Sequence, residues 1–247
     1  MATSDDPIAE GDIGRTVTVV PSRNRAAMSK DRLFYMGMAI AFIVAVFLGF
    51  APTYYLKSYF GAASLKPLVH LHGLLFTMWI VLVFAQTFLI ASRRVQTHRR
   101  LGMAGVGLAA LMVVVGGATA AVFARRNFAT LGPGILAPLT EIFLFAILAV
   151  AGIVYRRHPE AHKRLMLLAS IALLHAAIGR WRLGILQSGL LPNFIVTDLF
   201  VVAGIGYDLL SRRRIHPAYL WGGTLLVLSQ LVRNTSVWLA FLGWLVL

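Results

Sequence analysis

The stretch that decides the fold runs from Pro67 to Leu101 and reads PLVHLHGLLFTMWIVLVFAQTFLIASRRVQTHRRL. It begins with two histidines, continues through an apolar run long enough to cross a bilayer as a helix, and ends in a cluster of Arg and His side chains. A second basic cluster of the same kind follows at residues 156–164. The recurrence indicates that these clusters belong to the architecture of the protein.

The composition is that of a membrane protein. Of the 247 residues, 59% are hydrophobic and 13% are charged, which is more apolar than the core of a soluble domain requires. The absence of cysteine excludes disulfides, thiolate catalysis and cysteine-bound metals. The net charge of +14 lies mainly beside the apolar runs, so we interpret it as a signal of topology. We therefore expect the lipid bilayer as a partner and no nucleic acid.

Seven apolar runs follow a polar segment of residues 1–32, which we predict to be a flexible cytoplasmic tail ahead of a single domain at residues 33–247. The runs are continuous and lack period-2 alternation, which favours helices over a barrel. The expected fold is an all-α bundle of seven transmembrane helices, with the glycine-rich third run as a central helix. The predicted spans are 33–56, 67–91, 101–124, 136–155, 165–187, 192–210 and 217–245.

The distribution of Lys and Arg predicts the topology. These residues are concentrated in the tail, at 93–100, at 156–164 and at 212–214, whereas the alternate connections hold only Lys57, Lys66, Arg125 and Arg126. Because Lys and Arg favour the cytoplasmic side, we predict a cytoplasmic N-terminus and a periplasmic C-terminus in a bacterial inner membrane.

Polar side chains inside the spans mark the candidate site. Ionisable groups in a membrane are costly, so they normally face the bundle interior and pair with one another. Helical periodicity places His72 and Gln86 on one inward stripe, and His70 on a different face of the same helix. The residues of this predicted polar layer are His70, His72, Gln86, Glu141, His175, Arg180, Arg182, Asp198, Gln230, Arg233 and Asn234.

Three hypotheses account for the polar layer. In the first, His72 and His175 are axial ligands of a b-type haem, Arg182 and Arg233 are charge partners, and electrons pass to or from a quinone or another membrane redox protein. In the second, the layer binds no cofactor and serves a transporter or an assembly or accessory protein. In the third, His72, His175, Glu141 and Asp198 hold a metal in an intramembrane enzyme. None has a diagnostic spacing, so no catalytic residue is predicted.

A further pattern recurs at the basic clusters. His98 and His162 each follow an Arg pair by a few residues and precede two basic residues and a leucine. Setting the orientation of the spans is one interpretation of this frame. Binding of anionic lipid headgroups, or a haem ligand on the inner side, are the alternatives.

Two resemblances accompany these motifs. The blocks HLHGLLFTMWIVLVFAQ, THRRLG and PEAHKRLMLLASIALL resemble a group of uncharacterised bacterial multi-span membrane proteins. More distantly, the second and third spans resemble a hairpin of the transmembrane dihaem cytochromes b that ascorbate reduces, which implies a haem-bearing helical core. The fourth span departs from that pattern, because it carries Glu141 and no histidine. The residues that carry the distant resemblance are His70 or His72, Arg94, His98, Gly116, Gly117 and Asn127.

Overall fold

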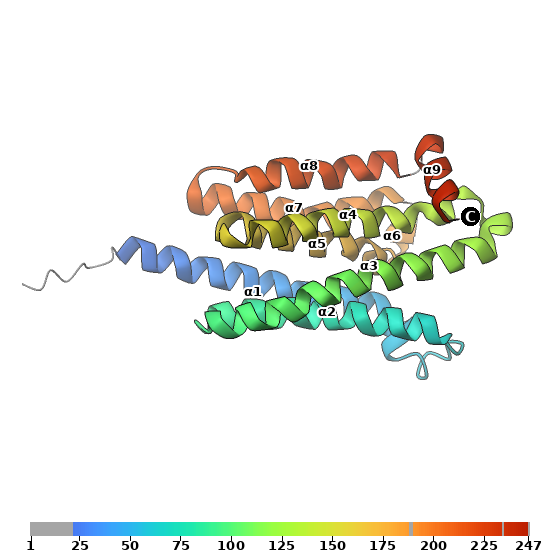
Figure 1. The fold of residues 1–247 in the computed structure, drawn as a ribbon, viewed down its shortest axis with the longest axis horizontal. Helices are drawn as coiled ribbons and strands as arrows, with labels where there is room; N and C mark the ends of the chain where they lie inside the picture. Colours follow the sequence, from blue (N-terminus) through green and yellow to red (C-terminus); the bar gives the residue numbers. More distant parts are fainter. Residues whose placement is uncertain (1–21, 188–189, 234, 247) are drawn as a thin grey trace, which may run out of the picture.

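The computed structural model describes residues 22–187, 190–233 and 235–246, and every regular element in these ranges is helical (Figure 1). The elements are α1 (Ser22–Phe50), η1 (Ala51–Tyr55), α2 (Pro67–Ala91), α3 (Val95–Leu131), η2 (Pro133–Leu136), α4 (Ala137–Val154), η3 (Tyr155–Arg157), α5 (Pro159–Ile178), α6 (Gly184–Gln187), α7 (Leu190–Arg212), α8 (Pro217–Val232) and α9 (Ser236–Val246). The all-α prediction is confirmed.

The number of membrane spans is six or seven. Six helices, α1 to α5 and α7, are long and apolar enough to cross a membrane. The predicted last span, 217–245, is not one straight helix, because α8 and α9 meet at a 90° bend. The two count as a seventh span only if taken together. The chain is thus an integral membrane bundle of six or seven spans, with a bent pair of helices at its C-terminal end.

The predicted span limits agree with the structure where the sequence marks a sharp boundary. The second span coincides with α2, whose first residue is Pro67, a residue suited to the first turn of a helix. The fifth does not: α5 begins six residues earlier than the predicted 165 and ends at Ile178, not at 187. Helix α1 begins at Ser22, so part of the predicted tail is helical, and residues 1–21 lie outside the described ranges.

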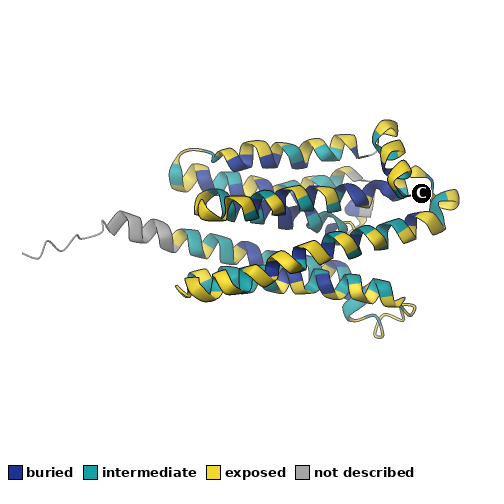
Figure 2. Ribbon diagram, viewed as in Figure 1, coloured by how far each residue is buried: buried dark blue, intermediate teal, exposed yellow. Residues whose placement is uncertain are grey.

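The central helix is α5, and not the third span as predicted. Of its most apolar stretch 67% is buried inside the protein, against 17% for α3. It packs against α1, α4, α7 and α8, and much of the ribbon between these helices is coloured as buried in Figure 2. The apolar side chains of Leu168 and Ile171 are fully buried. On its α2 side, the Trp79 indole donates a hydrogen bond to the Ser170 hydroxyl at 3.3 Å. Each face of α5 is therefore covered by another helix.

The contact between α1 and α5 depends on a glycine. A Cβ atom added to Gly49 would lie 2.8 Å from the carbonyl carbon of Ala177, which belongs to the α5 backbone. Backbone atoms cannot move aside as a flexible side chain can. Small residues permit this kind of close helix approach in membranes.

The two ends of the bundle differ in charge. We call the end where α2, α4 and α7 finish and α3, α5 and α8 begin the basic end, and the other the opposite end; they lie at the left and right of Figure 1. The basic end carries the Arg and Lys clusters at 93–100, 156–164 and 212–214. This is the asymmetry from which the orientation was predicted.

Candidate functional site

The best-defined part of the predicted polar layer is an ion pair near the opposite end. The guanidinium of Arg233, the residue that caps the C-terminal end of α8, donates a hydrogen bond to the Glu141 carboxylate of α4 at 3.1 Å. Both side chains are largely buried, with exposed fractions of 8% and 13%. Arg233 also lies over the Phe194 ring of α7, 5.4 Å from its centroid. The pair therefore joins three helices.

A small cavity adjoins this pair. It is lined by Thr140, Glu141, Leu144, Ala172, His175, Phe194, Thr197, Leu226, Ser229, Gln230 and Arg233. Its volume is about 20 Å³, enough for one water molecule. Two buried nitrogen atoms of the lining, Nδ1 of His175 and Nε of Arg233, have no hydrogen-bond partner among the described residues. Because buried polar atoms are normally satisfied, these nitrogens indicate a place for a polar ligand.

A second polar contact lies beside the cavity. Gln230 of α8 donates a hydrogen bond to Asp198 of α7 at 2.7 Å. Gln230 lines the cavity, whereas Asp198 does not. Of the predicted patch on the last span, Gln230 and Arg233 thus contribute to one site, and Asn234 lies outside the described residues.

The two histidines of α2 occupy different environments. His72 is half-buried, its ring stacks on Phe76 at 4.1 Å, and its buried Nδ1 has no described partner. His70 is exposed, and its backbone carbonyl accepts a hydrogen bond from the Tyr54 hydroxyl. Neither histidine lines the cavity. The structure therefore joins His175 to the Glu141–Arg233 pair and leaves His72 outside it.

The arginines after His175 do not continue its helix face. Because α5 ends at Ile178, Arg180 and Arg182 lie in the following connection, where glycine on either side disfavours helix. Arg180 lies over the Phe50 ring at 4.8 Å and Arg182 over the Phe60 ring at 5.5 Å. In the described ranges no carboxylate forms an ion pair with Arg182. The predicted role of Arg182 as a charge partner in this layer therefore finds no contact in the structure.

Gln86 belongs to the basic end and not to the layer for which it was predicted. It lies 14 residues after His72 on α2, about 21 Å along the helix axis. With the amide oriented to satisfy both neighbours, it donates to Nδ1 of His98 at 2.6 Å and accepts from the backbone N–H of Gly102 at 2.9 Å. Helix periodicity indicated the face of Gln86 but not this partner.

The alternative metal set is not assembled. Within the part of the chain that the structure describes, no three His, Asp or Glu side chains form a group that could hold a metal ion. Of the four proposed ligands, His175 and Glu141 line the cavity, whereas His72 and Asp198 do not.

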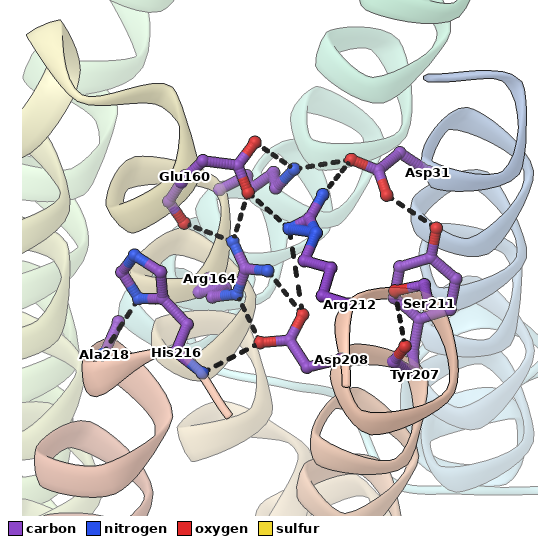
Figure 3. Close-up of polar contacts among 10 residues, drawn as sticks. Asp31, Glu160, Arg164, Tyr207, Asp208, Ser211, Arg212, His216 and Ala218 are labelled. Atoms are coloured by element: carbon purple, nitrogen blue, oxygen red, sulfur yellow. Dashed lines mark hydrogen bonds and ion pairs between the residues drawn. The ribbon is translucent and has the colours of Figure 1, made fainter. Parts of the chain in front are cut away.

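A second buried network lies at the basic end and was not predicted from the sequence. The Arg164 side chain of α5 is fully buried, and its Nε donates to the Asp208 carboxylate of α7 at 2.8 Å, while its NH2 binds the other carboxylate oxygen (Figure 3). Asp208, with 1% exposure, also accepts from the His216 backbone N–H at 3.1 Å. This two-point contact is the most buried ion pair in the described ranges.

The network continues from Arg164 toward α1. Glu160 binds Arg164 at 2.8 Å, Lys163 at 2.8 Å and also Arg212. Asp31 of α1 binds both Lys163 and Arg212 at 2.6 Å (Figure 3). The network therefore ties α1, α5 and α7 together at the basic end.

Sequence position alone gave little sign of this network. Its members lie at the ends of apolar runs, where charged side chains are normally solvated and set orientation. The one usable signal was Asp208, because a carboxylate within the last turns of an otherwise apolar span requires a partner.

Comparisons with known proteins give no assignment. The chain matches no known family, no curated protein and no solved structure. No function therefore comes to this chain from a likeness to a known protein.

The fit of the predicted haem can be tested on the cavity itself. Its volume of about 20 Å³ suits a water molecule and not a macrocycle, and of the two proposed axial ligands only His175 lines it. Both rings pack on phenylalanine, His72 on Phe76 and His175 on Phe194. As packed here, these residues do not fit a haem held between the two histidines.

Proposed function

We propose that this integral membrane protein is a proton-linked carrier whose ligand-binding centre is the cavity beside Glu141, Arg233 and His175. The observation that carries the proposal is a buried carboxylate–guanidinium pair that lines a cavity in which Nδ1 of His175 and Nε of Arg233 have no partner among the described residues. Intramembrane acids and histidines that face an internal cavity commonly mark ion and substrate pathways.

The pair suggests how proton binding and substrate binding are linked. A proton arriving at the Glu141 carboxylate neutralises it and weakens its hold on the Arg233 guanidinium. The guanidinium is then free to bind an anionic or polar group of a substrate. Loss of the proton restores the pair and displaces the substrate. Substrate binding and proton binding are coupled because the substrate and the unprotonated Glu141 carboxylate compete for Arg233.

The arrangement along α5 supports a carrier over an open channel. Arg164 and His175 are 11 residues apart, which places them about 16 Å apart along the axis and about 20° apart around it. Between them on that face lie Leu168 and Ile171, both fully buried. An apolar layer thus separates the two polar sites, so a charged substrate crosses only if the bundle changes conformation.

The broken last span supports the same proposal. The bend between α8 and α9 follows directly after Arg233, which caps α8. Transporters commonly place binding sites at discontinuous helices, because the interrupted backbone and adjacent side chains can bind a ligand. We further propose a bacterial inner membrane with the basic end cytoplasmic, on the charge asymmetry described above.

The test is proton flux in liposomes. Purified full-length protein is reconstituted with an entrapped pH-sensitive dye and with inorganic phosphate on both sides as the probe anion, and a pH gradient is imposed with potassium and valinomycin present to balance charge. We expect the unmodified protein to dissipate the gradient faster than empty liposomes and Glu141→Gln to fall to the empty-liposome rate. Asp198→Asn is the matched control, since it removes an intramembrane carboxylate outside the cavity lining.

Two results would count against the carrier. Equal flux through Glu141→Gln and the unmodified protein would show that the Glu141 carboxylate is not part of the proton pathway. No flux in any sample would show that the protein transports no protons. A b-type absorption spectrum of the purified, dithionite-reduced protein at near-stoichiometric haem would instead favour electron transfer with a quinone or membrane redox partner.

A further inference from the structure

Two histidines from the repeated basic frame meet at the basic end. His98 lies in the first turn of α3 and His162 in the first turn of α5. Their rings are 6.4 Å apart between centroids and nearly perpendicular, at 82°. Residues more than sixty positions apart in the chain are thus brought into one pair, which orientation of the spans alone does not require.

Hydrogen bonds fix both rings through the same nitrogen. Nδ1 of His98 accepts from the Gln86 amide at 2.6 Å, and Nδ1 of His162 lies 2.8 Å from the Gly152 carbonyl oxygen. Neither Nε2 has a hydrogen-bond partner in the described ranges. Each histidine therefore has one nitrogen held by the protein and one left for a ligand.

The charge of the basic end, where the pair lies, is strongly positive and largely unpaired. Three carboxylates of the basic end, from Asp31, Glu160 and Asp208, all bind Lys163, Arg164 or Arg212. The remaining cations of this end have no carboxylate partner within the described ranges. These are Lys30, Arg32, Arg93, Arg94, Arg99, Arg100, Arg156, Arg157, Arg213 and Arg214.

We infer that the His98–His162 pair and the arginines beside it form a binding site for the phosphate of an anionic phospholipid headgroup. Because Nδ1 of His98 accepts a hydrogen bond, Nε2 of the neutral ring carries the proton and can donate it to a phosphate oxygen, as the guanidinium groups can. The pair lies where spans begin, at the level of lipid headgroups, and unpaired Lys and Arg at that level attract anionic lipid. The same positive charge opposes a metal cation, although two imidazole nitrogens alone would otherwise suit one.

The test compares lipid retention between variants of the full-length protein. Protein purified in an uncharged detergent is mixed with phosphatidylglycerol, cardiolipin or phosphatidylcholine, and bound lipid is measured by native mass spectrometry and by the lipid-dependent rise in Tm. We expect anionic lipid, and not phosphatidylcholine, to bind the unmodified protein. His98→Gln with His162→Gln should weaken that binding about tenfold.

Matched variants separate the pair from bulk charge. His158→Gln changes an exposed histidine of the same end and should bind lipid as the unmodified protein does. Arg99→Gln with Arg100→Gln changes two exposed side chains that form no ion pair in the described ranges, so this variant should fold normally. It tests the site even if the double histidine variant fails to fold. It should weaken binding by roughly fivefold or more.

Three outcomes would overturn the inference. The first is lipid binding unchanged in both the histidine and the arginine double variants. The second is a rise in Tm with inorganic phosphate that equals the rise with the anionic lipids, which would indicate a site for a free anion. The third is stoichiometric zinc in the unmodified protein and none in the histidine double variant, which would make the pair a metal site.

Discussion

Neutralising Asp208 should destabilise the bundle strongly. In Asp208→Asn the buried Arg164 guanidinium loses the anion that binds it at two points, and the amide can replace only part of those contacts. Breaking a buried ion pair by removing one partner costs about 3–5 kcal/mol. Arg164 still donates to the carboxylate and to the backbone carbonyl of Glu160. We therefore expect a loss at the lower end of this range, about 3 kcal/mol.

The assay is unfolding in mixed micelles. The protein in a mild detergent is titrated with SDS, and helix content is followed by circular dichroism to give the free energy of unfolding. Glu160→Gln is the control, because its carboxylate is half exposed and its ion pairs are screened by solvent; we expect a loss of about 1 kcal/mol or less.

A second variant tests the physical reason for the loss. Arg164→Met with Asp208→Leu removes both charges and leaves apolar side chains of similar size. It should be more stable than Asp208→Asn, because no unpaired buried charge remains. If Asp208→Asn lay within about 0.5 kcal/mol of the unmodified protein, the partners that Arg164 retains would suffice, and the argument from burial would be refuted.

Two further changes test packing and pH. Gly49→Ala should destabilise by about 1–3 kcal/mol, since its Cβ meets the α5 backbone, whereas Gly37→Ala, with open space at its Cβ, should be neutral or stabilising; equal effects on Tm would refute the close approach. Burial, together with the Arg164 charge, lowers the pKa of His216 below its usual 6.5. The unfolded chain then binds the proton more readily, so stability should fall as pH drops through and below that value. His216→Asn, which can still cap α8 but cannot be protonated, should reduce this fall in unfolding measurements, and an unchanged slope would contradict the assignment.

The sequence predicted the elements better than their ends. Proline at position 67 and the Arg pair at 93–94 bound an apolar run, so the limits of α2 could be stated in advance. Helices α3 and α5 begin before their predicted starts, because charged residues at a membrane surface are compatible with a helix that continues into water. The break after α8 falls at Arg233, and a hydropathy pattern does not distinguish a bent helix from a straight one.

The candidate site was predictable in membership but not in pairing. Glu141, His175, Gln230 and Arg233 were named because polar groups in apolar spans need an explanation, and all four line one cavity. Their partners depend on helix rotation and on where α5 ends, which periodicity within single helices cannot give. Arg164 escaped prediction because a charge near the end of a span is solvated in most proteins.

The burial of α5 also bears on how the chain enters the membrane. Its mean hydropathy is 1.3, against 2.2 to 2.4 for the four spans before it, because Lys163 and Arg164 lie near its start and His175 lies in its last turn. Charged and polar side chains lower the tendency of a lone helix to insert, so a weakly apolar segment is poorly suited to partition into lipid by itself. The short connection at residues 155–158 allows α5 to enter together with the more apolar α4, against which it packs. Biogenesis of this bundle therefore favours insertion of α4 and α5 as one hairpin, with the Asp208 carboxylate of α7 arriving afterwards to neutralise Arg164.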